Sequence, residues 1–359
     1  MKKFFILLSV MICSASVFAY NPPLGGENIS RLTNPDLIGG SSSAAGGALY
    51  TITPSSIVFN PALTAREERV DFCLDGTVFF NTNKVELNGV EDKTAGGAFD
   101  LGVIFPTRFC VFSGIMQGVF AHFNTMNLRN SLVFHFNISK DVVADKLSVG
   151  MNLYSGFYMG EGSDFSIGAD LGFLYTFGDL GFLRNSRLGF AFLNLGKPVN
   201  GASYKTNGIK SSEGSSDYPA FLTPRFSFAG DLFHAYKFCG GFYTDLSFPT
   251  FQNVVFDLGF GFNWNKCISL NTCWQVNMRE VIENGKTGLL WPSVNLSFKF
   301  DFNSSKISMK NADWEKSEIV PSIAWQNLYN GIQAISFGAN MYMGMADVTA
   351  PEIFLWDEE

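Results

Sequence analysis

The sequence has little charge and, beyond its first residues, no long apolar run. Charged residues make up 16% of the 359 residues, whereas soluble domains average about 25%. No later stretch reaches the ~20 consecutive apolar residues that a membrane-spanning helix needs. A chain of this composition is suited to a closed β-barrel in lipid, where every backbone polar group pairs with a neighbouring strand. A secreted all-β protein with a large core is the alternative.

Basic tracts and clusters of reactive side chains are also missing. Without a run of Lys and Arg, a nucleic-acid partner is not expected. Only three histidines occur, His122, His135 and His234, and no local pattern places one with an Asp and a nucleophile as hydrolytic catalysis requires. We therefore expect neither an enzyme nor a cofactor.

The cysteines match no metal-site spacing. Beyond Cys13 the chain has Cys73, Cys110, Cys239, Cys267 and Cys273. Cys267 and Cys273 have no neighbouring His, so a zinc site is not expected. Five is an odd number, and in an exported chain it leaves at least one thiol free or bridged to another molecule. The simplest interpretation is that these are small buried or lumen-facing residues.

The first residues have the layout of a cleavable secretory signal. Lys2 and Lys3 precede an apolar segment from Phe4 to Cys13, and Val17-Phe18-Ala19 has the small-residue character of a cleavage site. A lipoprotein is disfavoured because Ile12, not a small residue, precedes Cys13. We assign residues 1–19 to the signal peptide and start the mature chain at Tyr20. Loss of both lysines takes the formal net charge from −7 to −9.

What the chain has in abundance is Phe and Gly, 38 and 36 residues, arranged with a period of two. In the segment 253–264, Phe256, Leu258 and Phe260 alternate with Asp257 and Gly259. Such alternation indicates strands with one apolar face. The segments run to about 11–13 residues, whereas soluble strands centre on about 5–6 and tilted membrane-spanning strands need about 9–11. Length therefore favours the membrane.

Alternating segments follow one another from residue 69 to residue 345. They cover Val70–Phe80, Ala95–Phe105, Phe109–Phe120, Leu128–Ile138, Leu147–Met159, Phe165–Phe177, Arg187–Leu195, Leu222–Leu232, Phe238–Phe248, Asn253–Trp264, Ile268–Met278, Leu290–Phe302, Lys316–Trp325 and Ile332–Met343. The fold class is therefore all-β, a transmembrane antiparallel barrel of about 14 strands. So many strands enclose more space than their own side chains fill.

Charged residues fall on the non-apolar face of these segments, which lines the lumen of a membrane barrel. The lumen-facing set is Asp100, Asp170, Arg187, Arg225, Asp245, Asp257 and Lys299. Two roles stay open for this set. One is an ion-pair network that braces the barrel wall or a lumen insert. The other is an electric field that repels anions or orients a substrate head group.

The segment 20–68 does not alternate and is rich in Gly, Ser, Ala, Pro and Asn. A disordered leader is one explanation. The other is a hatch packed inside the lumen, where small residues allow close backbone approach. Short helical turns are expected around Asn34–Leu37 and Pro61–Arg66. Apolar residues such as Leu37, Ile38 and Ile57 favour the hatch.

Within this segment the sequence resembles the FadL-like outer-membrane transporters of hydrophobic compounds. The resemblance rests on the small-residue stretch Gly39–Ala48, on Pro54-Ser55-Ser56, and on Phe59-Asn60-Pro61-Ala62-Leu63 just before the first strand. The broad superfamily also includes PorV-like barrels and uncharacterised spirochaetal members. The resemblance implies a fourteen-stranded barrel plugged by a hatch whose motif is Asn60, Pro61 and Ala62.

The resemblance also implies a function and a location. We expect a bacterial outer-membrane channel for hydrophobic small molecules such as long-chain fatty acids, gated by the hatch. Its partners would be outer-membrane lipid, the hydrophobic substrate and the outer-membrane assembly machinery. The alternatives are a non-transporting barrel that carries exported proteins and a surface-exposed structural or host-contact protein. Residues 346–359 follow the last strand as a tail, a departure from family barrels that end on an aromatic residue.

Overall fold

The computed structural model describes residues 22–82, 86–87, 90–91, 94–123, 126–159, 163–199, 205–206, 209–210, 221–284, 291–302, 317–329 and 331–346. The signal peptide expected over 1–19 and the tail from 347 onward lie outside these residues. Most of the long connection between residues 197 and 221 lies outside them too.

Long antiparallel strands dominate the described chain, as the alternation predicts. The sheet contains β1 (Arg69–Asn81), β4 (Ala95–Pro106), β5 (Val111–His122), β6 (Asn127–Val143), β7 (Leu147–Met159), β8 (Ser163–Leu180), β9 (Leu183–Lys197), β12 (Thr223–Ala235), β13 (Phe238–Ser247), β14 (Val255–Trp264), β15 (Ile268–Asn277), β16 (Ser293–Phe298), β17 (Phe300–Phe302), β18 (Ser317–Asn327) and β19 (Ile332–Ala346). Two small hairpins, β2 (Glu86–Leu87) with β3 (Val90–Glu91) and β10 (Lys205–Thr206) with β11 (Ile209–Lys210), stand apart.

The sheet closes on itself. Each strand pairs antiparallel with its neighbours in the chain, and the last strand, β19, returns to pair with β1. Strands β16 and β17 both pair with β18 in one continuous register, so they are a single strand interrupted at Lys299. The barrel therefore has fourteen strands, and the predicted fold class is confirmed.

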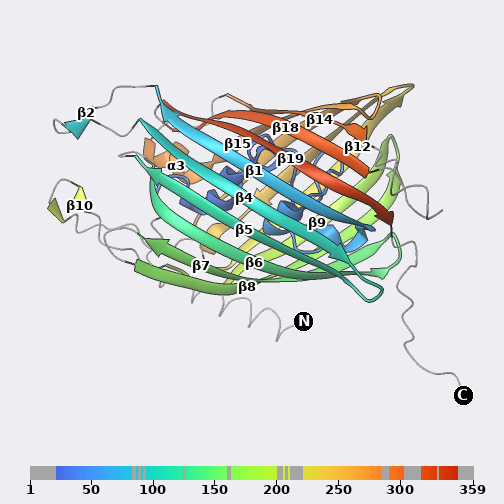
Figure 1. Ribbon diagram of the computed structural model, residues 1–359, viewed down its shortest axis with the longest axis horizontal. Coiled ribbons are helices and arrows are strands. Elements are labelled where there is room, and N and C mark those ends of the chain that lie inside the picture. Colours follow the sequence, from blue (N-terminus) through green and yellow to red (C-terminus); the bar gives the residue numbers. More distant parts are fainter. Residues whose placement is uncertain are drawn as a thin grey trace, which may run out of the picture.

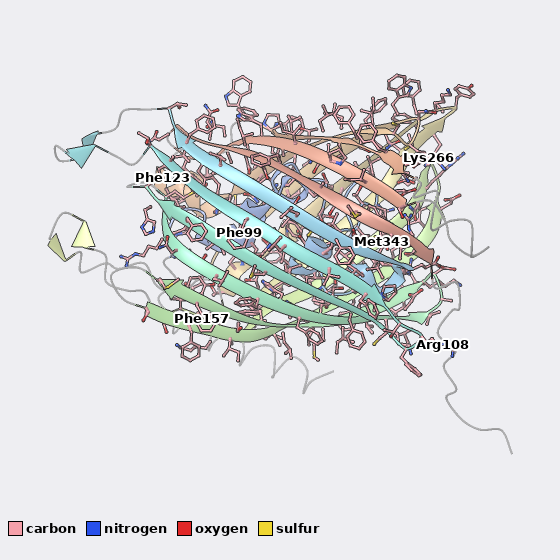
Figure 2. The ribbon with its side chains drawn as sticks, in the orientation of Figure 1. Phe99, Arg108, Phe123, Phe157, Lys266 and Met343 are labelled. Atoms are coloured by element: carbon pink, nitrogen blue, oxygen red, sulfur yellow. The ribbon has the colours of Figure 1, made fainter. Side chains whose placement is uncertain are left out.

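Alternation separates the two faces of the wall. In β8 the apolar side chains of Phe165, Phe173 and Phe177 are exposed, whereas Ser166 and Asp170 between them are buried. Large apolar side chains cover the outside of the barrel in the same way, and Figure 2 shows Phe99 and Phe157 projecting from it. An apolar outside around a polar inside is the arrangement of a barrel that spans a membrane.

The two ends of the barrel differ. At one end, tight turns join neighbouring strands, and Arg108 and Lys266 lie there in Figure 2. One such turn uses the left-handed backbone of Asn265 and Lys266, with φ of 55° and 56°. The opposite end carries the longer connections, with β2, β10 and α3 (Met278–Asn284). In outer-membrane barrels short turns face the periplasm and long loops face outward. The two ends are called the turn end and the loop end below.

Residues 22–68, called the hatch below, lie inside the barrel and appear blue in Figure 1. The hatch contains short helices, η1 (Gly26–Thr33), α2 (Pro35–Ile38), η2 (Pro54–Val58) and η3 (Leu63–Arg66). Helix α2 starts with Pro35 after Asn34, whose side chain accepts a hydrogen bond from the Leu37 backbone N–H. Such an N-cap stabilises a helix by about 1 kcal/mol. Both expected helical turns are present.

The hatch is packed, not loosely enclosed. Leu37, Ile38 and Ile57 are fully buried. Barrel side chains from several strands contact it, among them Asp100 of β4, Ser139 of β6 and Arg187 of β9. A short helix, η4 (Pro249–Phe251), and α3 lie in connections at the loop end. No helix of the described residues is long and apolar enough to cross a membrane.

Candidate functional site

Asp100 on β4 anchors the first half of the hatch. Its carboxylate accepts hydrogen bonds from Thr33 (3.2 Å), Asn34 (2.9 Å) and Ser55 (2.7 Å) of the hatch. A fourth comes from Gln117 of β5, at 2.9 Å. The side chain is fully buried, and a buried carboxylate is stable only when such donors replace water. Asp100 therefore joins two separate hatch segments to one point of the wall.

A second anchor is a buried chain of alternating charges. Arg31 of η1 donates to Asp257 of β14 at 3.0 Å, and Arg225 of β12 donates to Asp245 of β13 at 2.7 Å. Arg225 also lies 3.6 Å from Asp257, which links the two pairs. Its guanidinium sits 4.0 Å from the ring centre of Phe59 in the hatch. Removing one partner from a buried pair typically costs about 3–5 kcal/mol, because a buried charge is left uncompensated.

Asp245 and Arg187 hold the hatch by its backbone. Asp245 accepts from the backbone N–H of Ala44 at 2.8 Å. Arg187 on β9 donates to the carbonyls of Ala45 and Gly47, at 3.1 and 2.9 Å. The same guanidinium lies over the Tyr50 ring, 4.7 Å from its centre. Together these contacts fix the small-residue stretch against the β9–β13 wall.

The Asn60-Pro61-Ala62 motif connects the hatch to itself and to the wall. The Asn60 side chain donates to the Ala44 carbonyl (2.7 Å) and to the Phe173 carbonyl of β8 (2.9 Å). Its amide oxygen accepts from the Ala62 backbone N–H at 3.0 Å. All three residues of the motif are buried. Asn60 thus bridges two hatch segments and one strand, which gives a physical reason for an amide at this position.

Glycines on the inner wall allow the hatch backbone to approach the strands closely. A Cβ added at Gly150, Gly172, Gly189 or Gly241 would come closer than 3.0 Å to hatch atoms. The nearest atoms are the backbone oxygens of Pro61, Ala44 and Ala48, and the Asn60 side-chain oxygen at Gly172. These four residues, called the glycine track below, were not singled out from the sequence. The sequence feature that could have identified them is their position on the inward face of the alternating strands.

Asp170 and Lys299 do not contact the hatch through hydrogen bonds or ion pairs. Asp170 on β8 accepts from Asn152 of β7 at 2.6 Å and from the Asn194 backbone N–H at 2.6 Å. Lys299 lies near the turn end, in the break between β16 and β17, with its amine 2.6 Å from Glu318. Of the seven charged residues selected from the sequence, Asp100, Arg187, Arg225, Asp245 and Asp257 therefore converge on the hatch, and two do not.

Two cavities lie beside the hatch. The inner chamber, of about 60 Å³, is bounded by η1, by Val58 and Phe59, and by the wall residues His135, Asp170 and Arg225, among others. The outer chamber, of about 260 Å³, is bounded by Pro22–Gly25 and by residues of the loop end that include Tyr329. Glu27 and Asn28 line both chambers. Helix η1 therefore separates them.

Glu27 holds η1 at that position. Its carboxylate accepts from the side-chain amides of Asn253 (2.6 Å) and Asn277 at the loop end. Immediately after it, Asn28 departs from helical geometry, with φ −128° and ψ 37°. The partition between the chambers is thus a kinked segment held by polar contacts.

Burial raises the pKa of two hatch carboxyls. Burial raises the pKa of Glu67 to about 7, although nearby Arg69 opposes the shift. Burial also raises the pKa of Asp36, which accepts a hydrogen bond from Asn340 of β19 at 2.9 Å. In both cases the neutral acid is favoured because the charged form has lost water. Docking of the hatch is therefore expected to depend on pH.

Among the described residues, the remaining histidines and cysteines do not form a second site. His122 bonds to Asn130, and His234 bonds to Asp231 near the turn end. The cysteines after Cys13 are all free thiols. Within the described residues, no group of three or more His, Cys, Asp or Glu side chains is placed to hold a metal ion.

Known structures share this architecture. No protein-family model and no curated protein matches the sequence. The Ralstonia pickettii toluene transporter TbuX matches with a TM-score of 0.50 and 10% identity, over 89% of this chain and 99% of that one. The Pseudomonas putida toluene transporter TodX matches with a TM-score of 0.51 and 10% identity, over 88% and 98%. A Pseudomonas aeruginosa FadL homologue matches with a TM-score of 0.50 and 12% identity, over 90% and 99%.

These matches extend over 98–99% of each known chain. At 10–12% identity they establish the fold and not the cargo. The chain has the fold of the FadL-like hydrophobic-compound channels, a fourteen-stranded antiparallel barrel with an amino-terminal segment outside the sheet.

Proposed function

We propose that this protein is a channel of the bacterial outer membrane that takes up hydrophobic small molecules and is gated by its hatch. The observation that carries the proposal is the docked hatch, which fills the lumen and leaves two chambers in series beside η1. A barrel that only displayed loops would need no such insert. The fold is one that toluene transporters use, and this likeness supports the same class of cargo.

The polar anchors suit a gate better than a permanent plug. The hatch is held at discrete points, by Asp100, by the Arg31–Asp257 pair and by Arg187. Each point can be broken without unfolding the barrel, because the fourteen strands close through their own backbone pairing. A shift of η1 at Glu27 and Asn28, which line both chambers, would join the two chambers. In this proposal that shift opens the outer half of the route.

Two classes of cargo, fatty acids and small aromatic hydrocarbons, are candidates for such a channel. The sequence resemblance favours long-chain fatty acids, whereas the two matched transporters are described as toluene transporters. An uptake assay separates these classes. The protein would be expressed in a Gram-negative host that lacks its own fatty-acid and aromatic channels, and entry of labelled oleate and labelled toluene would be followed.

The proposal expects entry of at least one compound to rise above the rate of cells with an empty vector. A variant with Ser43→Cys in the hatch and Ser227→Cys in the wall, where the two native hydroxyl oxygens lie 3.0 Å apart, supplies the control, since a disulfide between these positions would lock the hatch to the wall. Entry should then fall and recover on reduction. If neither compound enters and an exported protein co-purifies with the barrel, the protein-carrier alternative is favoured instead.

A further inference from the structure

One buried histidine of the inner chamber has an unused donor. Asn152 donates its side-chain amide to Asp170 at 2.6 Å, and the same nitrogen lies 2.9 Å from His135 Nδ1. A carboxylate only accepts, so the amide atom beside it is the nitrogen. His135 Nδ1 must then accept as well. In the neutral ring the proton is therefore on Nε2.

That Nε2–H has no acceptor among the described residues. His135 is 9% exposed and lines the inner chamber. The Tyr154 ring packs against it at 5.7 Å between centres, which restricts the imidazole. A buried donor left without an acceptor is costly, and an acceptor bound in the chamber would remove that cost. Its position and orientation point to an acceptor atom supplied by a ligand.

The residues that line the inner chamber indicate the polarity and charge of that ligand. Ile29, Val58, Phe59, Leu193 and Pro249 contribute apolar surface. Both arginines of the chamber are already paired, Arg31 with Asp257 and Arg225 with Asp245. Asp170 has no such cation: among the described residues its partners are amides. A ligand carboxylate would therefore meet a like charge beside Asp170, whereas a neutral oxygen would not.

We propose that the inner chamber is a binding site for neutral, oxygen-bearing apolar molecules, whose oxygen accepts the Nε2–H hydrogen bond of His135. Ketones, aldehydes and esters are the chemical class. A chamber of about 60 Å³ admits the oxygen and a few carbons, and a longer body extends toward the outer chamber past Glu27 and Asn28. This inference rests on the proposed channel function and adds a preference within its cargo: the inner chamber should bind compounds with a neutral oxygen more tightly than pure hydrocarbons or carboxylate anions.

The test compares two ligands that differ in a single non-hydrogen atom. Cyclopentanone and methylenecyclopentane have nearly the same shape, but only the ketone accepts a hydrogen bond. Binding of each to the purified mature protein in detergent micelles is measured by saturation-transfer NMR, with cyclopentanecarboxylate as the anion. One hydrogen bond to a buried donor corresponds to about tenfold in affinity. The ketone should therefore bind about tenfold more tightly than the alkene, and the anion more weakly than the ketone.

Variants assign the effect to one side chain. His135→Phe keeps a flat ring and removes the donor, so the two isosteres should bind within about twofold of each other. His135→Gln retains an N–H and should restore part of the preference. His234→Phe, at an exposed histidine near the turn end, should leave the preference unchanged. In protein labelled with ¹⁵N-histidine, the ketone should shift one imidazole signal, and that signal should be missing in His135→Phe.

Several results would overturn the inference. They are equal binding of the isosteres to the wild type, a preference that survives in His135→Phe, and tightest binding of the anion. If His135→Phe does not fold into a heat-modifiable barrel, Leu193→Trp replaces it, since this change fills the chamber from the wall and should abolish binding of the ketone. Equal binding of ketone and alkene rejects the His135 role and leaves the channel intact. Binding of no apolar compound at all counts against the channel as well.

Discussion

Substitution of Gly189 by Ala tests how the hatch docks. An added Cβ would come closer than 3.0 Å to three backbone atoms of Ala44 and Ala45. Backbone cannot rotate away as a side-chain tip can, so the hatch or the wall must move by on the order of 1 Å. The same movement would strain the hydrogen bond from Ala44 to Asp245. The substitution should therefore weaken docking of the hatch without disturbing the backbone pairing of β9.

The magnitude follows from overpacking, which typically costs about 1–3 kcal/mol. If that cost falls on the docked state alone, the ratio of docked to undocked hatch falls by about 5- to 150-fold. Single-channel recording in planar bilayers measures this directly as the frequency and duration of open events. Gly189→Ala should therefore open far more often than the wild type.

Gly114→Ala is the matched control, since its added Cβ would meet only the His135 carbonyl, at an ordinary 3.7 Å. It should behave as the wild type does. The reasoning is refuted if Gly189→Ala and Gly114→Ala give the same open probability while both migrate as folded barrels on unheated gels. That outcome would mean that the hatch does not need the close approach that the glycine track provides.

Two further predictions concern charge. Asp257→Ala leaves Arg31 buried without its partner and should lower the stability of the docked hatch by about 3–5 kcal/mol. Limited proteolysis of residues 22–68 should then become fast. Slow proteolysis would argue against the Arg31–Asp257 pair as an anchor. Glu67, with its pKa raised to about 7 by burial, binds a proton more tightly in the docked hatch than in water, where its ordinary value is 4.5. Its contribution to docking is therefore full below about pH 4.5 and is lost as the pH rises through 7. Open probability should be higher at pH 8 than at pH 5.5, and Glu67→Gln should remove most of that difference; an unchanged pH dependence in the variant would assign it to another group.

Much of the wall could be predicted from the sequence because its physics is local. Side chains alternate along a strand, so runs such as Phe165–Phe177 reveal both a strand and its lipid-facing side. All fourteen predicted segments correspond to barrel strands, and the break at Lys299 merely divides one of them. Alternation predicts which face of the wall a side chain lies on, but not its position along the barrel axis. This is why Lys299 has the expected register yet pairs with Glu318 near the turn end, away from the hatch.

The contacts of the hatch could not be predicted in the same way. Arg31 and Asp257 are 226 residues apart, and no local pattern relates them. The glycine track depends on which hatch atom meets which strand, which follows only from the closed barrel. Alternation with Phe134 and Phe136 predicts that His135 faces inward. Its unused donor, however, depends on Asn152 and Asp170 meeting across neighbouring strands. Long-range packing, not propensity, decides each of these.

The most direct test of a gated lumen is removal of the hatch. Deleting residues 22–65 leaves all fourteen strands and their closing pair intact. Conductance in planar bilayers should rise from brief, rare openings to a steady open level, because a barrel of this size encloses more space than its wall side chains fill. An unchanged conductance, from protein shown to be a folded barrel, would contradict the account, since it would mean that residues 22–65 do not close the lumen.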